Sequence, residues 1–306
     1  MSSRPSSFTE GAADIAAVEG PTVTLWFDVR RKLKRDRRFW IAAVLIAIFV
    51  GMAIAPQAFF TESLDPVHCN LSNSALTPSR EHWFGTDILG CDYYTRVVYG
   101  ARTSIEVGFI VGTLIVVIAL SLGSASGYFG GKTDMVISRF ADIWFSVPTT
   151  LGAILALSLF HGGGTLAIAL VLVFFGWPDM TRLVRSTVIG GKHRGYVRAA
   201  KTMGSPSRTI MRRHVLPNGI APVLVFAAYT IGGAVGGEAG LTFLGVGLRL
   251  PAISWGLQIS IAQTRFTSDP YLLFFPSLFL SFLIGGFVLL GESLRDALDV
   301  KLIEHA

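Results

Sequence analysis

Residues 196–218 read YVRAAKTMGSPSRTIMRRHVLPN and contain two short segments with helical spacing of apolar residues. The positions that recur at helical spacing are Val197, Ala200 and Met203 or Gly204 in the first segment, and Ile210, Met211, His214 and Val215 in the second. Between the segments, Gly204 can adopt the left-handed conformation that ends a helix. Ser205 can accept N–H groups of the next helix, and Pro206 suits its first turn. The stretch therefore predicts a helix-turn-helix.

The residues around this stretch are strongly basic. The cations are Arg182, Arg185, Lys192, Arg194, Arg198, Lys201, Arg208, Arg212 and Arg213, and the acid among them is Asp179. Membrane proteins concentrate Lys and Arg in cytoplasmic loops, so this pattern predicts a cytoplasmic loop between two membrane spans. A basic loop that binds acidic lipid headgroups is the alternative interpretation.

The composition is that of a multi-pass membrane protein. Of the 306 residues, 51% are hydrophobic and 15% are charged, which is atypical of a soluble domain. The net charge of +6 is concentrated in two blocks, residues 30–38 and 182–213, that adjoin apolar runs. Membrane topology explains these blocks more simply than nucleic-acid binding does.

Long uncharged runs predict an all-α protein with six transmembrane helices. The expected spans are 39–60, Val107–Gly131, a third from near Met135, a fourth from Thr165 past Trp177, Val215–Gly237 and Pro270–Gly291. His161 and Gly162–Gly164 interrupt the run between the third and fourth spans and predict an outer turn. No second His or carboxylate stands at metal spacing from His161, so we expect no metal site.

The same patterns divide the chain into segments. We expect a disordered tail (1–24), an interfacial helix (25–38), the first span (39–60), an extracytoplasmic loop (61–103), a core (104–291) that includes a cytoplasmic loop (190–218), and a tail (292–306). Basic residues before the first span place the N-terminus in the cytoplasm, and six crossings return the C-terminus to the same side.

Both cysteines, Cys69 and Cys91, lie in the expected extracytoplasmic loop. An oxidising compartment would permit a disulfide between them, and two free thiols are the alternative.

The basic stretch resembles the "EAA" loop of permease subunits in ABC importers. Ala199, Ala200, Gly204, Leu216, Pro217 and Asn218 stand at matching places, whereas Arg198 replaces the usual Glu. The resemblance implies docking of this loop on a separate ATPase subunit. The implied coupling residues are Tyr196, Val197, Arg198, Ala199, Ala200, Met203, Gly204, Ser205, Pro206, Ile210 and Pro217.

Two further stretches resemble the dipeptide, oligopeptide and nickel group of these permeases. They are residues 82–104, in which Cys91 stands where the group usually has Arg, and residues 237–256. In the second stretch Glu238, Thr242, Phe243, Leu244 and Gly245 are candidates for a pore or gate. This stretch is either a re-entrant segment beside a translocation path or a simple outer loop. Residues 25–38 resemble the family's "elbow" helix.

No motif predicts catalysis by this chain. Residues 130–133 imitate the end of a P-loop, but Ser126 occupies the place of its first glycine. The expected spans contain few ionisable residues, with Glu106 and Glu238 at their edges, which disfavours an ion-coupled transporter or channel. A non-transporting membrane scaffold is a further alternative.

The resemblance therefore implies a non-enzymatic subunit in a bacterial cytoplasmic membrane. Its implied partners are a second homologous permease subunit, two ATP-binding subunits or one fused ATPase, an extracytoplasmic substrate-binding protein and membrane lipid, with no nucleic acid. ATP and Mg would be bound by the ATPase partners, and this chain would hold no cofactor. The implied cargo is a dipeptide or oligopeptide, with nickel or another small solute as the alternative.

Overall fold

The computed structural model describes residues 22–59, 69–159 and 164–298, and these residues form helices without a β-strand. The α-helices are α2 (Thr22–Arg35), α3 (Arg37–Ile54), α4 (Tyr93–Phe129), α5 (Gly131–Phe145), α6 (Thr149–Leu159), α7 (Thr165–Lys192), α8 (Gly195–Thr202), α9 (Ser207–Ile210), α10 (Leu216–Phe243), α11 (Trp255–Ala262) and α12 (Tyr271–Leu298). Expectations for the tail up to residue 21, for 161–163 and for 299–306 fall outside the described residues.

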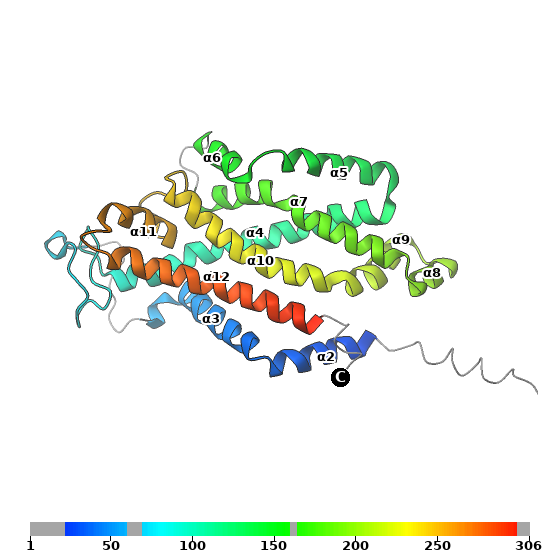
Figure 1. Ribbon diagram of the computed structural model, residues 1–306, viewed down its shortest axis with the longest axis horizontal. Helices are drawn as coiled ribbons and strands as arrows, with labels where there is room; N and C mark the ends of the chain where they lie inside the picture. Colours follow the sequence, from blue (N-terminus) through cyan, green and yellow to red (C-terminus); the bar gives the residue numbers. More distant parts are fainter. Residues whose placement is uncertain (1–21, 60–68, 160–163, 299–306) are drawn as a thin grey trace, which may run out of the picture.

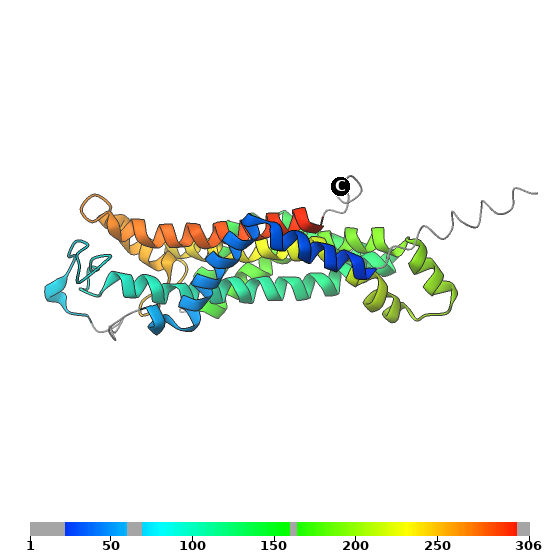
Figure 2. The same cartoon turned by 90° about the horizontal axis from the view of Figure 1, so that it is seen from below.

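The long helices run side by side along the molecule (Figures 1 and 2). Five helical segments of the described chain are long and apolar enough to cross a membrane: Arg37–Ile54, Tyr93–Phe129, Thr165–Lys192, Ser207–Phe243 and Tyr271–Leu298. Helices α5 and α6 together supply a sixth crossing if the pair counts as one span. The all-helical membrane architecture expected from the sequence is thereby confirmed.

The third crossing differs from the expected single helix that begins near Met135. Helices α5 and α6 meet at a bend of 83°. The break covers residues 146–148 and ends at Pro148. Proline has no N–H to donate and disfavours helical geometry in the residue before it, here Val147. The conformational constraint at Pro148 therefore divides this uncharged apolar run into two helices.

Several helices extend beyond the limits that hydropathy predicted. Helix α4 begins at Tyr93, so residues 93–103 are helix and not loop, and the Asp92 carboxylate caps the new start by accepting the Thr95 N–H at 2.8 Å. Helix α7 continues to Lys192, α10 to Phe243 and α12 to Leu298. Hydropathy locates the part of a helix in hydrocarbon, whereas polar residues can continue the same helix past it.

Helices α4 and α7 pack closely because small residues of α4 face α7. A Cβ at Gly123 would lie 2.7 Å from the Thr181 carbonyl oxygen, and one at Gly127 would lie 2.8 Å from that of Arg185. Small residues permit such close backbone approach between membrane helices. Gly123 and Gly127 therefore account for the close packing of α4 against α7.

We therefore expect Gly123→Ala to push α4 and α7 apart and to destabilise the bundle by about 1–3 kcal/mol, because the new methyl group overpacks against backbone. The thermal midpoint of the purified protein measures this effect. Gly190→Ala is the matched control, since Gly190 lies in α7 and has nothing within 4 Å of its Cβ position. Equal midpoints for the two variants would contradict the packing argument.

The two ends of the molecule have different structures. At one end, α11 and the loop of residues 69–92 cover the helix termini (Figure 1). Cys69 and Cys91 are joined there in a disulfide, with Cα atoms 4.5 Å apart. At the other end lie α8 and α9, whereas α12 ends and α2 joins α3 part-way along the molecule (Figure 1). Arg38 at the start of α3 and Asp296 near the end of α12 form an ion pair of 3.4 Å.

Candidate functional site

The turn in the candidate coupling loop is a complete helix-stop motif. Gly204 has φ +81° and follows the last residues of α8. The Gly204 N–H donates to the Lys201 carbonyl and the Ser205 N–H donates to the Ala200 carbonyl, each at 3.1 Å. This pair of bonds is the Schellman motif, which requires a left-handed residue at the glycine position.

The second helix of the loop begins differently from the prediction. Ser205 does not cap it; Pro206 stands at the N-cap position and no side chain caps the helix. The Pro206 carbonyl instead accepts the Thr209 N–H at 2.9 Å. The Ser205 backbone N–H donates to Ala200 at the end of α8, so Ser205 belongs to the helix-stop motif of α8.

The loop residues divide into a buried and an exposed set. Val197, Ala200 and Ile210 are 4%, 3% and 1% exposed and pack in one cluster with Val184 and Val188 of α7. The exposed set consists of Tyr196, Arg198, Ala199, Met203, Gly204, Pro206 and Pro217. One face of the loop is therefore attached to the membrane bundle and the other is open to a partner.

The loop is also continuous with a membrane helix. Helix α9, a π-helical turn (Met211–Val215) and α10 form one helical segment, Ser207–Phe243. The sequence predicted a separate span from Val215 to Gly237. Because a helix transmits displacement along its axis, a force on α9 would reach the opposite end of α10.

A cavity of about 580 Å³ lies between α4, α6, α7 and α10. Its walls contain apolar residues, several hydroxyl groups and a glycine-rich face of α10; the lining is Val111, Ile115, Thr149, Thr150, Ala153, Leu172, Phe175, Gly176, Asp179, Phe226, Tyr229, Thr230, Gly233, Ala234, Gly236, Gly237, Gly240, Leu241 and Leu244. A Cβ at Gly233 or Gly240 would meet nothing within 4 Å. The glycines thus leave the cavity open.

Asp179 is the charged residue among those described that line this cavity. In the sequence, Asp179 stands out only as the acid beside a basic loop. Since α7 runs from Thr165 to Lys192, Asp179 lies near the middle of a membrane helix. Asp179 directly follows the uncharged run of α7 that begins at Thr165. Charged residues within membrane helices face a bundle interior or a water-filled path.

The candidate pore residues have unequal positions. Of that set, Leu244 lines the cavity. Phe243 is 39% exposed, and Gly245 has φ +81° in the turn after α10. Glu238 and Thr242 are fully buried, so neither lines an open path. Glu238 lies within α10, five residues before the helix ends at Phe243.

Glu238 joins three parts of the chain. Its carboxylate accepts hydrogen bonds from the hydroxyls of Thr242 and Ser254 at 3.0 Å each and of Ser104 at 3.3 Å. The Thr242 and Ser254 oxygens in turn accept the N–H groups of Leu248 (3.2 Å) and Leu257 (3.1 Å). The network ties α4 and α10 to the loop before α11.

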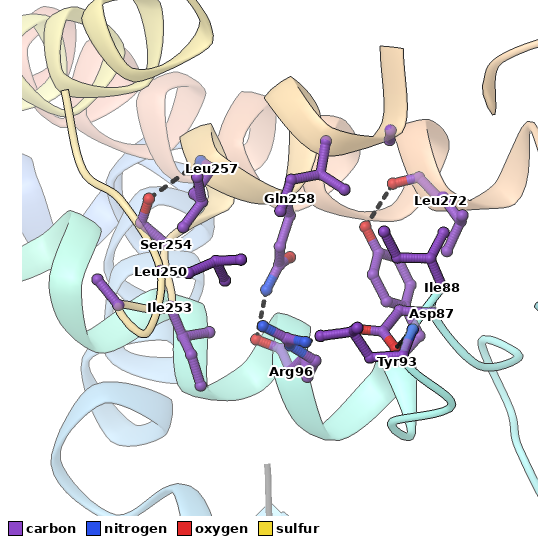
Figure 3. Close-up of a pocket in the computed structure, with 14 residues that line it drawn as sticks. Asp87, Ile88, Tyr93, Arg96, Leu250, Ile253, Ser254, Leu257, Gln258 and Leu272 are labelled. Carbon is purple, nitrogen blue, oxygen red and sulfur yellow. Dashed lines mark hydrogen bonds and ion pairs between the residues drawn. The ribbon is translucent and has the colours of Figure 1, made fainter. Parts of the chain in front are cut away.

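A smaller cavity of about 80 Å³ lies between the start of α4 and α11, at the end of the molecule that carries the disulfide (Figure 3). The Arg96 guanidinium forms an ion pair there with Asp87. Gln258 of α11 donates to the Arg96 carbonyl at 2.7 Å, and the Tyr93 hydroxyl donates to the Leu272 carbonyl of α12 (Figure 3). These contacts attach the loop of residues 69–92 and α11 to the bundle.

Comparison with known proteins identifies the family. Residues 109–304 match the model of the family described as "Binding-protein-dependent transport system inner membrane component", which is more than half of the chain. The chain belongs to this family. The permease is 35% identical to the oligopeptide transport system permease protein OppC of Bacillus subtilis (strain 168), over 95% of this chain and 94% of the relative.

Other relatives of the permease carry similar descriptions. It is 36% identical to the dipeptide transport system permease protein DppC of Alkalihalophilus pseudofirmus, over 92% of this chain and 91% of the relative. It is 33% identical to the glutathione transport system permease protein GsiD of Pectobacterium atrosepticum, over 91% and 92%.

A solved structure has the same fold. The inward-facing MetNI methionine ABC transporter contains a chain that superimposes with a TM-score of 0.54 at 19% identity, covering 66% of this chain and 95% of that chain. Together the comparisons show that the protein is a permease component of an ABC importer and a multi-pass protein of the inner membrane.

Proposed function

We propose that this permease forms half of a translocation pore for dipeptides or oligopeptides. The curated relatives named above are peptide-class permeases that match over nine-tenths of the chain. The cavity beside α10 supports the proposal, because its hydroxyl groups and open volume suit a small polar cargo. A second homologous permease subunit would close the open side of this cavity.

The candidate coupling loop supports an ATP-driven mechanism. Its exposed face, around Tyr196, Met203 and Gly204, would dock on a partner ATPase that binds ATP and Mg. The buried face would transmit closure of the ATPases to α7 and α10 as a rigid body. An extracytoplasmic binding protein would deliver cargo at the end that carries α11 and the disulfide. Both chain termini would lie in the cytoplasm, and the chain itself would catalyse no reaction.

Reconstitution tests this function. The permease would be placed in liposomes with its second permease subunit, ATPase subunits and binding protein, and uptake of a labelled tripeptide would be measured. We expect uptake that requires both ATP hydrolysis and the binding protein. Uptake driven by an ion gradient without ATP would support an ion-coupled transporter instead, and nickel uptake without peptide uptake would support the alternative cargo.

A further inference from the structure

The acids and bases of α7 are not paired with one another. Arg182 donates to Asp142 of α5 at 2.6 Å and lies 3.8 Å from the centroid of the Phe145 ring. Arg185 donates to Asp134 of α5, also at 2.6 Å. Helix α5 therefore supplies the carboxylates that neutralise the cations of α7.

Asp179 therefore forms no ion pair with a cationic side chain among the described residues. Among the residues that the structure describes, it makes no ion pair or hydrogen bond, and the nearest cation along the helix, Arg182, is directed to Asp142. The Asp179 side chain is exposed to the cavity. Leu172, Phe175 and Gly176 line the cavity from the same face of α7, because residues three, four and seven positions apart share a helix face.

The rest of the cavity is neutral. Thr149 and Thr150 at the start of α6, and Tyr229 and Thr230 on α10, contribute hydroxyl groups, and the remaining lining residues are apolar or glycine. A single negative charge in a low-dielectric, partly enclosed space attracts cations strongly, since field lines are focused there. The chemistry fits a cargo with one positive group and several amide groups.

We propose that Asp179 selects charge in this cavity by attracting the protonated amino group of a peptide cargo and orienting that end toward α7. The identity of the cargo in this inference rests on the proposed function. The negative potential in the cavity rests only on the residues that line it. The competing occupant is a Lys or Arg side chain of the second permease subunit. Such a cation would neutralise Asp179 and leave no negative potential to attract the amino group of the cargo.

The field can be measured without any cargo. The chain's two cysteines are joined to each other. Thr230 lines the same cavity as Asp179, so Thr230→Cys would supply a free thiol in this cavity, in a complex whose other subunits are cysteine-free. The probes are a cationic trimethylammonium-ethyl and an anionic sulfonatoethyl methanethiosulfonate. The ratio of the cationic to the anionic reaction rate would be compared among three Thr230→Cys proteins: one that keeps Asp179, one with Asp179→Asn and one with Asp179→Glu.

We expect Asp179→Asn to lower the cation-to-anion rate ratio about tenfold, equivalent to about 1.4 kcal/mol, and Asp179→Glu to preserve it. An unchanged ratio in Asp179→Asn would overturn the proposal and indicate neutralisation by the partner subunit.

Uptake of labelled trialanine by the reconstituted complex tests the cargo step. We expect Asp179→Asn to reduce uptake severalfold and Asp179→Glu to retain most of it. Trialanine uptake at the parental rate by Asp179→Asn would overturn the assignment to the amino group. Absence of uptake by the parental complex would instead count against the proposed function, and the thiol measurement would still decide the electrostatics.

Discussion

Replacing Gly204 by valine is expected to reduce ATP-dependent uptake at least tenfold while the subunits still assemble. Gly204 has φ +81°, and nothing lies within 4 Å of its Cβ position, so the obstacle is backbone conformation and not space. A left-handed residue with a Cβ costs about 1–2 kcal/mol, and a β-branched residue is a genuine outlier there. The valine would break the two hydrogen bonds that close the turn and would redirect α8.

Uptake per ATP hydrolysed, measured in the reconstituted complex, reports this loss of coupling. Gly204→Asn is the conservative variant, because Asn tolerates the left-handed region. Gly195→Val is the positional control: Gly195 begins α8 with an ordinary backbone and open surroundings. If the Gly204→Val complex assembled and transported at the parental rate, the proposal that this loop couples to the ATPase would be wrong.

Glu238→Ala is expected to destabilise the permease by about 3 kcal/mol, because hydroxyls of Ser104, Thr242 and Ser254 would lose their buried acceptor. The lost side chain would also leave a cavity, since Glu238 is fully buried. We expect the thermal midpoint of the purified complex to fall by about 5 °C or more. Glu238→Gln keeps the side-chain volume and one acceptor oxygen, so its thermal midpoint should lie between those of the parental protein and of Glu238→Ala.

Glu106→Ala is the matched control for this experiment. Glu106 is an acid on the adjacent helix α4, but its side chain is exposed. We expect its midpoint to stay within about 1 °C of the parental protein, because surface substitutions usually change stability by less than 0.5 kcal/mol. Equal effects of the two alanine variants would show that the Glu238 network does not hold α11 and α10 together.

Local features of this protein were predictable because their causes are local. The turn at Gly204 followed from one residue that tolerates positive φ between two helical patterns. The membrane spans followed from uncharged runs. Their limits were less predictable: α4 begins before the apolar run and includes Arg96, whose charge Asp87 neutralises in the folded protein.

The sequence by itself determined the membrane-spanning class, the family and the shape of the candidate coupling loop. The tertiary structure decided which acids neutralise which bases, and it placed Glu238 in a buried network and Asp179 in an open cavity. The physical reason is that burial and pairing depend on neighbours distant in the chain. Asp134 and Asp142 pair with α7 across 51 and 40 residues of sequence, and no spacing rule along one helix reports such contacts.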